Sequence, residues 1–455
     1  MSAALPTIEH LAADLAAGRT SAVALTEAAL ARARDPAGEG ARTFTHVSPE
    51  RALATARASD LLRAAGIVRS PLEGLPISVK DLFDVAGEVT TAGSAVLRDA
   101  APAARNAPVI ERLIGAGAVI VGRTSMSEFA FSGLGLNPHY GTPANPWDRA
   151  ARRIPGGSSS GAAVSVTDGM AVMALGTDTG GSVRIPSALC GLTGFKPTQR
   201  RVPTAGTVPL STSLDSIGPL GASVRCCAIT DTILAGDAGP EPAPRELAGA
   251  RLAVPETVVL DGMDATVAAA FERALGRLSA AGARITRLAV PEFAEFAGLQ
   301  ARGTLAAAEA WAWHRRLLAE RESEYDPRVG SRIRGGDKMG AADYIDLLAA
   351  RRRWIAQVQA RIDGFDVLAL PTVPVVAPPI AELQASDVAY FAANSLILRN
   401  PTLINFLDGC ALSLPCHRPG DAPVGLMLAA PAAHDRWILA LGEGVERVLG
   451  HAEDT

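Results

Sequence analysis

The sequence predicts an α/β protein with one large domain, in which many helices flank a mixed, mostly parallel central β-sheet. Short apolar runs with the character of buried strands alternate along the chain with longer segments of helical periodicity, and this alternation is typical of parallel sheets. The 455 residues are 48% hydrophobic and 20% charged, which suits a large core and excludes a disordered chain. No repeat of solenoid period is visible, so the single domain is expected to span residues 1–455.

The first part of the chain, about residues 1–65, is predicted to be a helical segment. Apolar residues recur through 7–34, and Thr20 and Ser21 offer an N-cap for a second helix within that stretch.

The next part, about residues 66–235, is predicted to be the core of the domain. It contains three short apolar runs with the character of buried strands, at 75–81, 118–122 and 170–176. Between the first two, residues 108–115 form an expected helix with proline in its first turn. The third run leads directly into a glycine-rich turn at 177–181.

The remaining chain divides into a region of about 240–364 and a C-terminal return to the core at about 365–455. A loop rich in proline and charge at 240–246 opens the first of these. The predicted strands are 251–255, 284–290 and 365–370, and the predicted helices are 265–281, 303–322 and 341–362.

Charge and targeting signals favour small-molecule chemistry in the cytoplasm. A net charge of -4 and a pI near 6.0 provide no concentrated basic surface, so we expect neither nucleic acid nor a membrane as a partner. The N-terminus has no basic leader followed by an apolar run, which predicts a cytoplasmic location. The apolar stretch 367–383 contains four prolines, which argue against a spanning helix.

The five cysteines and seven histidines show no spacing typical of a metal site. The cysteines form no C-x-x-C pair with histidines at zinc spacing, so we expect reduced core cysteines and no metal.

Two clusters of glycine and serine carry the candidate chemistry, at 155–161 and 176–186. The first has the composition of a flexible linker, but a helix is expected to follow it directly. It also fits the G-x-S-x-G nucleophile elbow centred on Ser159, with His417 or His434 as partner. That motif needs a preceding strand, whereas 147–155 is rich in arginine and bounded by proline, so the elbow is disfavoured.

The second cluster places Ser182 directly after Thr179, Gly180 and Gly181. The one Asp178-Thr-Gly sequence in it lacks the second copy that an aspartic protease requires, and no phosphate-loop pattern is present. Glycines allow consecutive backbone N–H groups to converge on one point, as a developing oxyanion requires. Ser182 is therefore a candidate nucleophile that still needs a base.

Lysine is rare in this chain, and one lysine is a candidate base. Lysine occurs only at Lys80, Lys196 and Lys338, so 40 of the 43 basic residues are arginine. Arginine cannot lose its proton in a protein, whereas a buried lysine can. Lys80 ends an apolar predicted strand, while Lys196 and Lys338 are expected in loops. The alternative for Lys80 is a surface ion pair with Asp81 or Asp84.

Lys80 and the two clusters together closely resemble the amidase signature family. The resemblance runs from about 75 to 197 and continues through 201–220, 366–377 and 423–427. It implies Ser182 as nucleophile, Ser158 as a bridging serine preceded by a cis peptide bond, and Lys80 as general base. It further implies an oxyanion hole made by the backbone of Thr179, Gly180, Gly181 and Ser182, with site support from Ser159, Asp178 and Arg184. Thr167 departs from the family, which prefers Gly, Ala or Ser at that position.

The function implied by this resemblance is hydrolysis of an amide carbon–nitrogen bond through an acyl-enzyme, without a cofactor. The leading hypothesis is a stand-alone amidase acting on a small soluble amide or urea-like compound. One alternative is the glutamine-hydrolysing component of a tRNA-dependent amidotransferase, which works with partner subunits, and a second is a catalytically silent scaffold protein. Family analogy also implies a homodimer or a small accessory subunit.

Substrate contacts are predicted from two segments. Met126, Phe129 and Phe131 are candidates for the acyl side of the pocket, although aromatic residues at this spacing are also typical of a core. In the region 240–364, where family members differ and substrate selection is expected, Tyr325, Arg328 and Arg332 are candidates for contact with a polar or anionic substrate.

Overall fold

Eleven strands form one sheet in the computed structural model, which describes residues 5–450. Their order across the sheet is β1-β3-β2-β4-β6-β5-β10-β11-β9-β7-β8. The strands are β1 Phe44–Val47, β2 Pro76–Lys80, β3 Val119–Thr124, β4 Met173–Asp178, β5 Thr193–Lys196, β6 Ser216–Gly221, β7 Arg251–Pro255, β8 Arg284–Leu288, β9 Val367–Pro371, β10 Cys410–Pro415 and β11 Gly425–Ala430.

The prediction of a mixed sheet is confirmed, but the prediction that it is mostly parallel is wrong. Among the ten strand pairings within residues 5–450, four are parallel and six are antiparallel. The parallel pairs form two separate groups, β3-β2-β4 and β9-β7-β8, and the strands between them are antiparallel. A short connection such as 416–424 between β10 and β11 permits only an antiparallel pair, and the alternation of helices and strands does not reveal such connections.

Helices cover the sheet and both ends of the molecule. The α-helices of the first half are α1 Ile8–Ala16, α2 Ala22–Arg34, α3 Gly40–Thr43, α4 Pro49–Ala64, α5 Pro108–Gly115, α6 Ser160–Thr167, α7 Arg184–Cys190 and α8 Val224–Ala235. Those of the second half are α9 Ala265–Ala280, α10 Glu292–Leu299, α11 Leu305–Arg321, α12 Pro327–Arg334, α13 Ala341–Arg361, α14 Ile380–Ala385, α15 Asp387–Phe406 and α16 Asp435–Gly450. Four 3₁₀ turns lie at Glu128–Ala130, Arg149–Ala151, Glu322–Glu324 and Gly335–Lys338.

Several predicted elements are confirmed with the same bounds. The helix at 108–115 is α5, the strand at 251–255 is β7, and Ser21 caps α2 by accepting from the Ala24 N–H. One correction concerns the helical segment 1–65, which also contains the edge strand β1 paired with β3.

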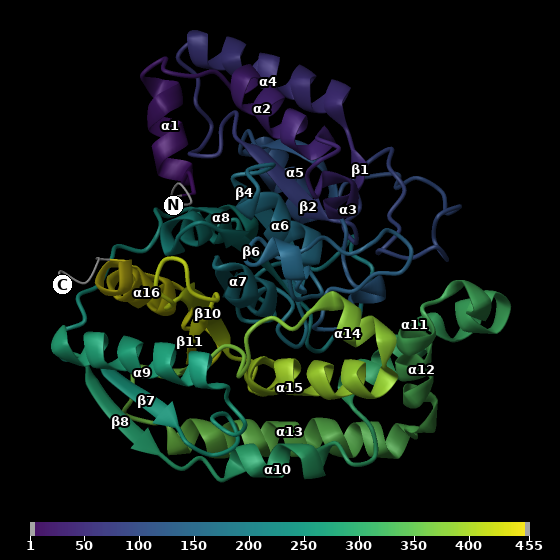
Figure 1. Cartoon of the computed structure of the whole chain (residues 1–455), viewed down its shortest axis with the longest axis vertical. Coiled ribbons are helices and arrows are strands. Elements are labelled where there is room, and N and C mark those ends of the chain that lie inside the picture. The colour runs from purple at the N-terminus through teal and green to yellow at the C-terminus, as the bar shows by residue number, and fades with distance from the viewer. Residues whose placement is uncertain (1–4, 451–455) are drawn as a thin grey trace.

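Figure 1 shows α2 and α4 at one end of the long axis and α10 and α13 at the other, with α15 in the same half as α13. The strands β7 and β8 of the region 240–364 extend the same sheet, so this region is part of one α/β domain. The limits of the internal segments remain a prediction. Within residues 5–450, no helix combines the length and apolar character that crossing a bilayer requires.

Candidate active site

Lys80 lies at the end of a central strand that is buried throughout. β2 pairs with β3 on one side and β4 on the other, and none of its residues is exposed to solvent. Its apolar residues Ile77 and Val79 belong to the largest core cluster. The strand therefore carries the Lys80 ammonium group into the interior, and the alternative of a surface ion pair with Asp81 or Asp84 is wrong.

The Lys80 Nζ donates to two hydroxyls inside the protein. It lies 2.7 Å from Ser158 Oγ and 2.9 Å from Thr177 Oγ1. Burial lowers the pKa of Lys80 from 10.5 to about 7, although the charges of Asp215 and Asp178 act in the opposite direction. A substantial share of Lys80 is thus neutral near pH 7, as a general base must be.

Ser158 lies in the turn that precedes α6. The Gly157–Ser158 peptide bond is cis, which confirms the expectation from the family resemblance. The Ser158 carbonyl accepts from the Ser127 N–H at 3.0 Å, and the neighbouring Ser159 N–H donates to the Ser182 carbonyl at 3.3 Å. These bonds join the two glycine- and serine-rich clusters, which are separate in the sequence.

Ser182 lies in the loop between β4 and α7, and the buried carboxylate of Asp178 organises this loop. Asp178 accepts from the Gly181 N–H at 2.8 Å and the Val183 N–H at 3.2 Å. The Arg184 guanidinium pairs with it at 2.9 Å. Burial alone would raise the pKa of Asp178, but the adjacent Arg184 charge holds it below its usual range. The geometry agrees with the predicted bracing by Asp178 and Arg184.

The expected oxyanion hole needs one correction. The Gly181 N–H already donates to Asp178 Oδ1, so it is not available to a substrate oxygen. In residues 5–450, the N–H groups of Thr179, Gly180 and Ser182 donate to no protein acceptor and remain available. Gly181 instead permits the loop conformation, because its φ of 124° is one that other residues rarely adopt.

Asp215 is a buried acidic residue of the site that no pattern in the sequence indicates. It accepts from Thr179 Oγ1 at 2.5 Å and from the Leu210 N–H at 3.0 Å. Burial raises its pKa from 3.8 to about 6. Its charge also acts on Lys80, so it contributes to the electrostatics of the site.

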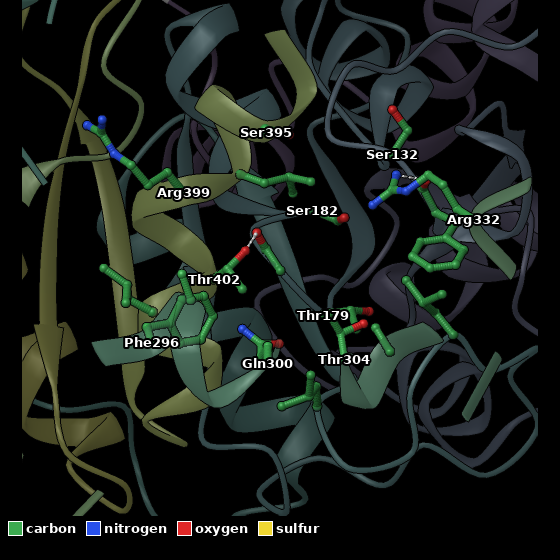
Figure 2. A pocket seen from close by; sticks show the side chains of 18 of the residues that line it. Ser132, Thr179, Ser182, Phe296, Gln300, Thr304, Arg332, Ser395, Arg399 and Thr402 are labelled. Atoms are coloured by element: carbon green, nitrogen blue, oxygen red, sulfur yellow. Dashed lines mark hydrogen bonds between the residues drawn. The ribbon is translucent and has the colours of Figure 1, made fainter. Parts of the chain in front are cut away.

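A cavity of about 520 Å³ opens onto Ser182, a size typical of pockets for small molecules. Figure 2 shows Ser182 and Thr402 on one part of its wall and Arg332 facing them from another. Its walls come from several distant segments, among them α10, α12 and α15. The residues that line it are Ala130, Phe131, Ser132, Thr179, Gly180, Ser182, Leu210, Leu214, Val258, Phe293, Ala294, Phe296, Ala297, Gln300, Thr304, Ala306, Arg332, Ser395, Leu398, Arg399, Thr402 and Leu403.

Two of the six predicted pocket residues, Phe131 and Arg332, line this cavity, and the other four do not. Phe129 packs in the core against Tyr325, with ring centroids 5.4 Å apart.

The remaining two predicted pocket residues are also placed elsewhere. Met126 is buried in the core, and Arg328 forms an ion pair with Asp387 at 2.7 Å. The sequence pattern does not separate Phe129, in the core, from Phe131, on the cavity wall, because aromatic residues at this spacing are typical of both.

Hydrogen bonds also decide two further sequence predictions, the nucleophile elbow at Ser159 and the loop position of Lys196. Within the described residues no histidine is hydrogen-bonded to Ser158, Ser159 or Ser182, and the Ser159 hydroxyl donates to the Thr177 carbonyl, so the nucleophile elbow is wrong. Lys196 is buried at the end of β5, where it donates to the carbonyls of Pro197 and Gly409, and the expected loop position is wrong.

Within residues 5–450, no group of three or more His, Cys, Asp or Glu side chains is arranged so that it could hold a metal ion. All five cysteines are free thiols.

Comparison with known proteins identifies the family. The model of the Amidase family matches residues 24–439. The chain belongs to the amidase family. This amidase-family chain is 39% identical to 2-amino-5-chloromuconic acid deaminase of Comamonas testosteroni, across 88% of this chain and 87% of that protein. It is 35% identical to the A subunit of the glutamyl-tRNA(Gln) amidotransferase of Chloroflexus aggregans, across 97% and 96% of the two chains.

Solved amidase structures agree with this assignment. The crystal structure of an amidase superposes with a TM-score of 0.87 at 33% identity, across 98% of this chain and 100% of that one. This amidase-family chain is therefore a hydrolase that acts on amide carbon–nitrogen bonds.

Proposed function

We propose that this amidase-family chain hydrolyses a small soluble amide or urea-like compound through an acyl-enzyme on Ser182, with Ser158 and Lys80 as its proton relay. The observation that carries the proposal is the buried Lys80 Nζ, 2.7 Å from Ser158 Oγ. Its pKa of about 7 makes it a base at neutral pH. Ser182, at the other end of the relay, faces the 520 Å³ cavity.

In the acylation step, Ser182 Oγ attacks the amide carbonyl carbon. The Ser182 proton passes to Ser158 Oγ, whose own proton passes to neutral Lys80. The available N–H groups of Thr179, Gly180 and Ser182 are suited to stabilise the oxyanion; losing one such donor in an enzyme typically costs about 3 kcal/mol. The proton then returns along the relay to the leaving nitrogen, and ammonia or an amine departs.

In the deacylation step, water attacks the acyl-enzyme. The relay removes one proton from this water and returns it to Ser182 Oγ as the ester bond breaks. The products are a carboxylic acid and the free enzyme. Every proton moves between side chains of this chain and the reactants.

The second candidate is a glutamine-hydrolysing amidotransferase component that delivers ammonia to a partner. It is supported by 35% identity to one such protein over nearly the full length of both chains. The first candidate is supported by the higher identity to an enzyme whose name, 2-amino-5-chloromuconic acid deaminase, describes a small molecule as its substrate. A catalytically silent scaffold is disfavoured because Lys80, Ser158 and Ser182 are all present.

The test measures ammonia or amine release by the purified chain across glutamine, malonamide, biuret and aryl amides. We expect the wild-type chain to turn over at least one of these amides. Turnover should fall by about 1,000-fold or more in each of the variants Ser182→Ala, Ser158→Ala and Lys80→Met. A fluorophosphonate should label Ser182, as detected by mass spectrometry, and Ser182→Ala controls for labelling elsewhere. Lys80→Met with near wild-type turnover would contradict the relay, whereas glutamine hydrolysis only with a partner would favour the second candidate.

A further inference from the structure

Arg332 brings a positive charge to the cavity without a carboxylate partner. It lies in α12, and its Nη1 donates to the Phe131 carbonyl. Its guanidinium also lies over the Phe131 ring, 4.3 Å from the ring centroid. Among residues 5–450 no Asp or Glu side chain forms an ion pair with it. Burial lowers its pKa, but a guanidinium keeps its proton in proteins, so the charge persists.

The neighbouring cavity arginine, Arg399, is bonded in a different way. Its Nε donates to Asn400, its Nη1 to the Asp261 carbonyl and its Nη2 to the Val259 carbonyl. Arg399 therefore uses three of its five N–H groups on acceptors of the protein. Arg332 has one such bond, and its remaining N–H groups are available to a ligand.

The position of Arg332 directs this charge toward the reaction centre. In Figure 2 its guanidinium extends from α12 toward the part of the cavity where Ser182 lies. Arg332 and Arg399 are the charged side chains among the described residues that line the cavity, so the cavity wall has an excess of positive charge. Burying a cation without an anion is costly, and a guanidinium binds carboxylates in a bidentate manner.

Much of the remaining cavity wall is apolar. Leu210, Leu214, Val258, Phe293, Phe296 and Leu403 line the cavity. Such walls favour a hydrocarbon or unsaturated segment in the middle of the substrate.

We propose that this chain selects amides that also carry a carboxylate, and that Arg332 binds this carboxylate while an apolar segment spans the cavity to Ser182. This inference rests on the proposed function. It narrows the substrate from any small amide to an amic acid.

The test compares matched substrate pairs. Succinamate, glutaramate and adipamate are each paired with the methyl-ended primary amide of the same chain length, and ammonia release gives kcat and KM. The wild-type chain should prefer at least one amic acid over its neutral partner by about tenfold or more. Arg332→Met should lower kcat/KM for that amic acid by about 100-fold, chiefly through KM, and change neutral amides by less than about threefold. Arg332→Lys should restore part of the loss.

Arg328→Met is the matched control. It removes an arginine from the same helix that pairs with Asp387 instead of lining the cavity, so amic-acid kinetics should not change. Circular dichroism and thermal unfolding confirm that each variant is folded. If Arg332→Met slows both members of a pair equally, or if the wild-type chain shows no preference for amic acids, the carboxylate assignment is wrong while the relay can still hold.

A binding measurement separates this inference from failure of the chemistry. Glutarate, which cannot be hydrolysed, should bind Ser182→Ala in calorimetry, and binding should weaken by about 100-fold when Arg332→Met is added. Absence of glutarate, succinate and adipate binding to Ser182→Ala would overturn the inference. Binding that depends on Arg332 in a chain that hydrolyses no amide would instead contradict the proposed function.

Discussion

Replacing Lys80 by methionine should abolish turnover and yet stabilise the protein at neutral pH. The folded chain holds the pKa of Lys80 at about 7, whereas an exposed lysine in the unfolded chain has the ordinary value of 10.5. At pH 8, folding therefore removes a proton that the unfolded chain retains, at a cost of about 3 kcal/mol, since one pKa unit corresponds to about 1.4 kcal/mol. Methionine has a similar length and carries no such cost.

Part of that gain is offset by lost hydrogen bonds. Lys80 donates to Ser158 and Thr177, and each bond contributes about 1 kcal/mol. The net stabilisation of Lys80→Met is then about 1 kcal/mol at pH 8. Between pH 7 and 10.5 the unfolded wild-type chain binds more protons at this site, so wild-type stability rises with pH relative to the variant, by about 1.4 kcal/mol per pH unit. The order of stabilities should invert at about pH 9.

The assay is guanidinium unfolding followed by far-UV circular dichroism at pH 7.5, 8.5 and 9.5. Lys338→Met, which removes an exposed lysine, controls for the loss of one positive charge. The difference between wild type and Lys80→Met should change by about 3 kcal/mol across this range. A difference that does not vary with pH would refute the reasoning, because it would mean that Lys80 has the same pKa in both states.

Two further predictions concern catalysis. The kcat/KM of the wild-type chain should fall about tenfold per pH unit below about pH 7, as Lys80 becomes protonated. Asp215→Asn removes a charge that raises the Lys80 pKa, so this variant should show the same fall at lower pH. A pH–rate profile in which the two chains coincide would contradict the role of Asp215. Thr402→Val should lower kcat about tenfold with little change in KM, because Thr402 Oγ1 donates to the Gly180 carbonyl at 3.2 Å and so orients the peptide beside the proposed oxyanion donors. Steady-state kinetics in which only KM rises would show that Thr402 binds substrate instead.

The parts of the site that could be predicted from the sequence have local signals. Lys80 was identifiable because lysine is rare in this chain and because it ends an apolar strand, and β2 is indeed buried along its length. Ser182 follows glycines at the end of β4, where a tight turn requires them. The bridging role of Ser158 came only from the family resemblance, since nothing in the Gly/Ser run itself connects it with Lys80.

The cavity could not be predicted because its walls are assembled from distant segments. Phe131 and Arg332 are predicted from the sequence, but Phe293 in α10 and Thr402 in α15 share no pattern in the sequence that marks them as neighbours of Ser182. Asp215 was missed for a related reason: it is an isolated acid before β6, and only the fold brings it to Thr179. The sequence favours a loop position for Lys196, whereas the fold buries it and brings it to the carbonyl of Gly409, 213 residues away.

The two buried acids near Lys80 differ in what their charge does. Asp178 is paired with Arg184 at 2.9 Å, so much of its field is neutralised, and its oxygens hold the loop that carries Ser182. Asp215 has no cation paired with it among the described residues and accepts bonds from neutral donors such as Thr179 Oγ1. Its charge therefore acts on Lys80 with less compensation, and it raises the pKa of Lys80 more than the charge of Asp178 does. Burial of β2 and the charge of Asp215 act in opposite directions on one amine, and their balance holds its pKa near neutrality, where it can both take and return a proton.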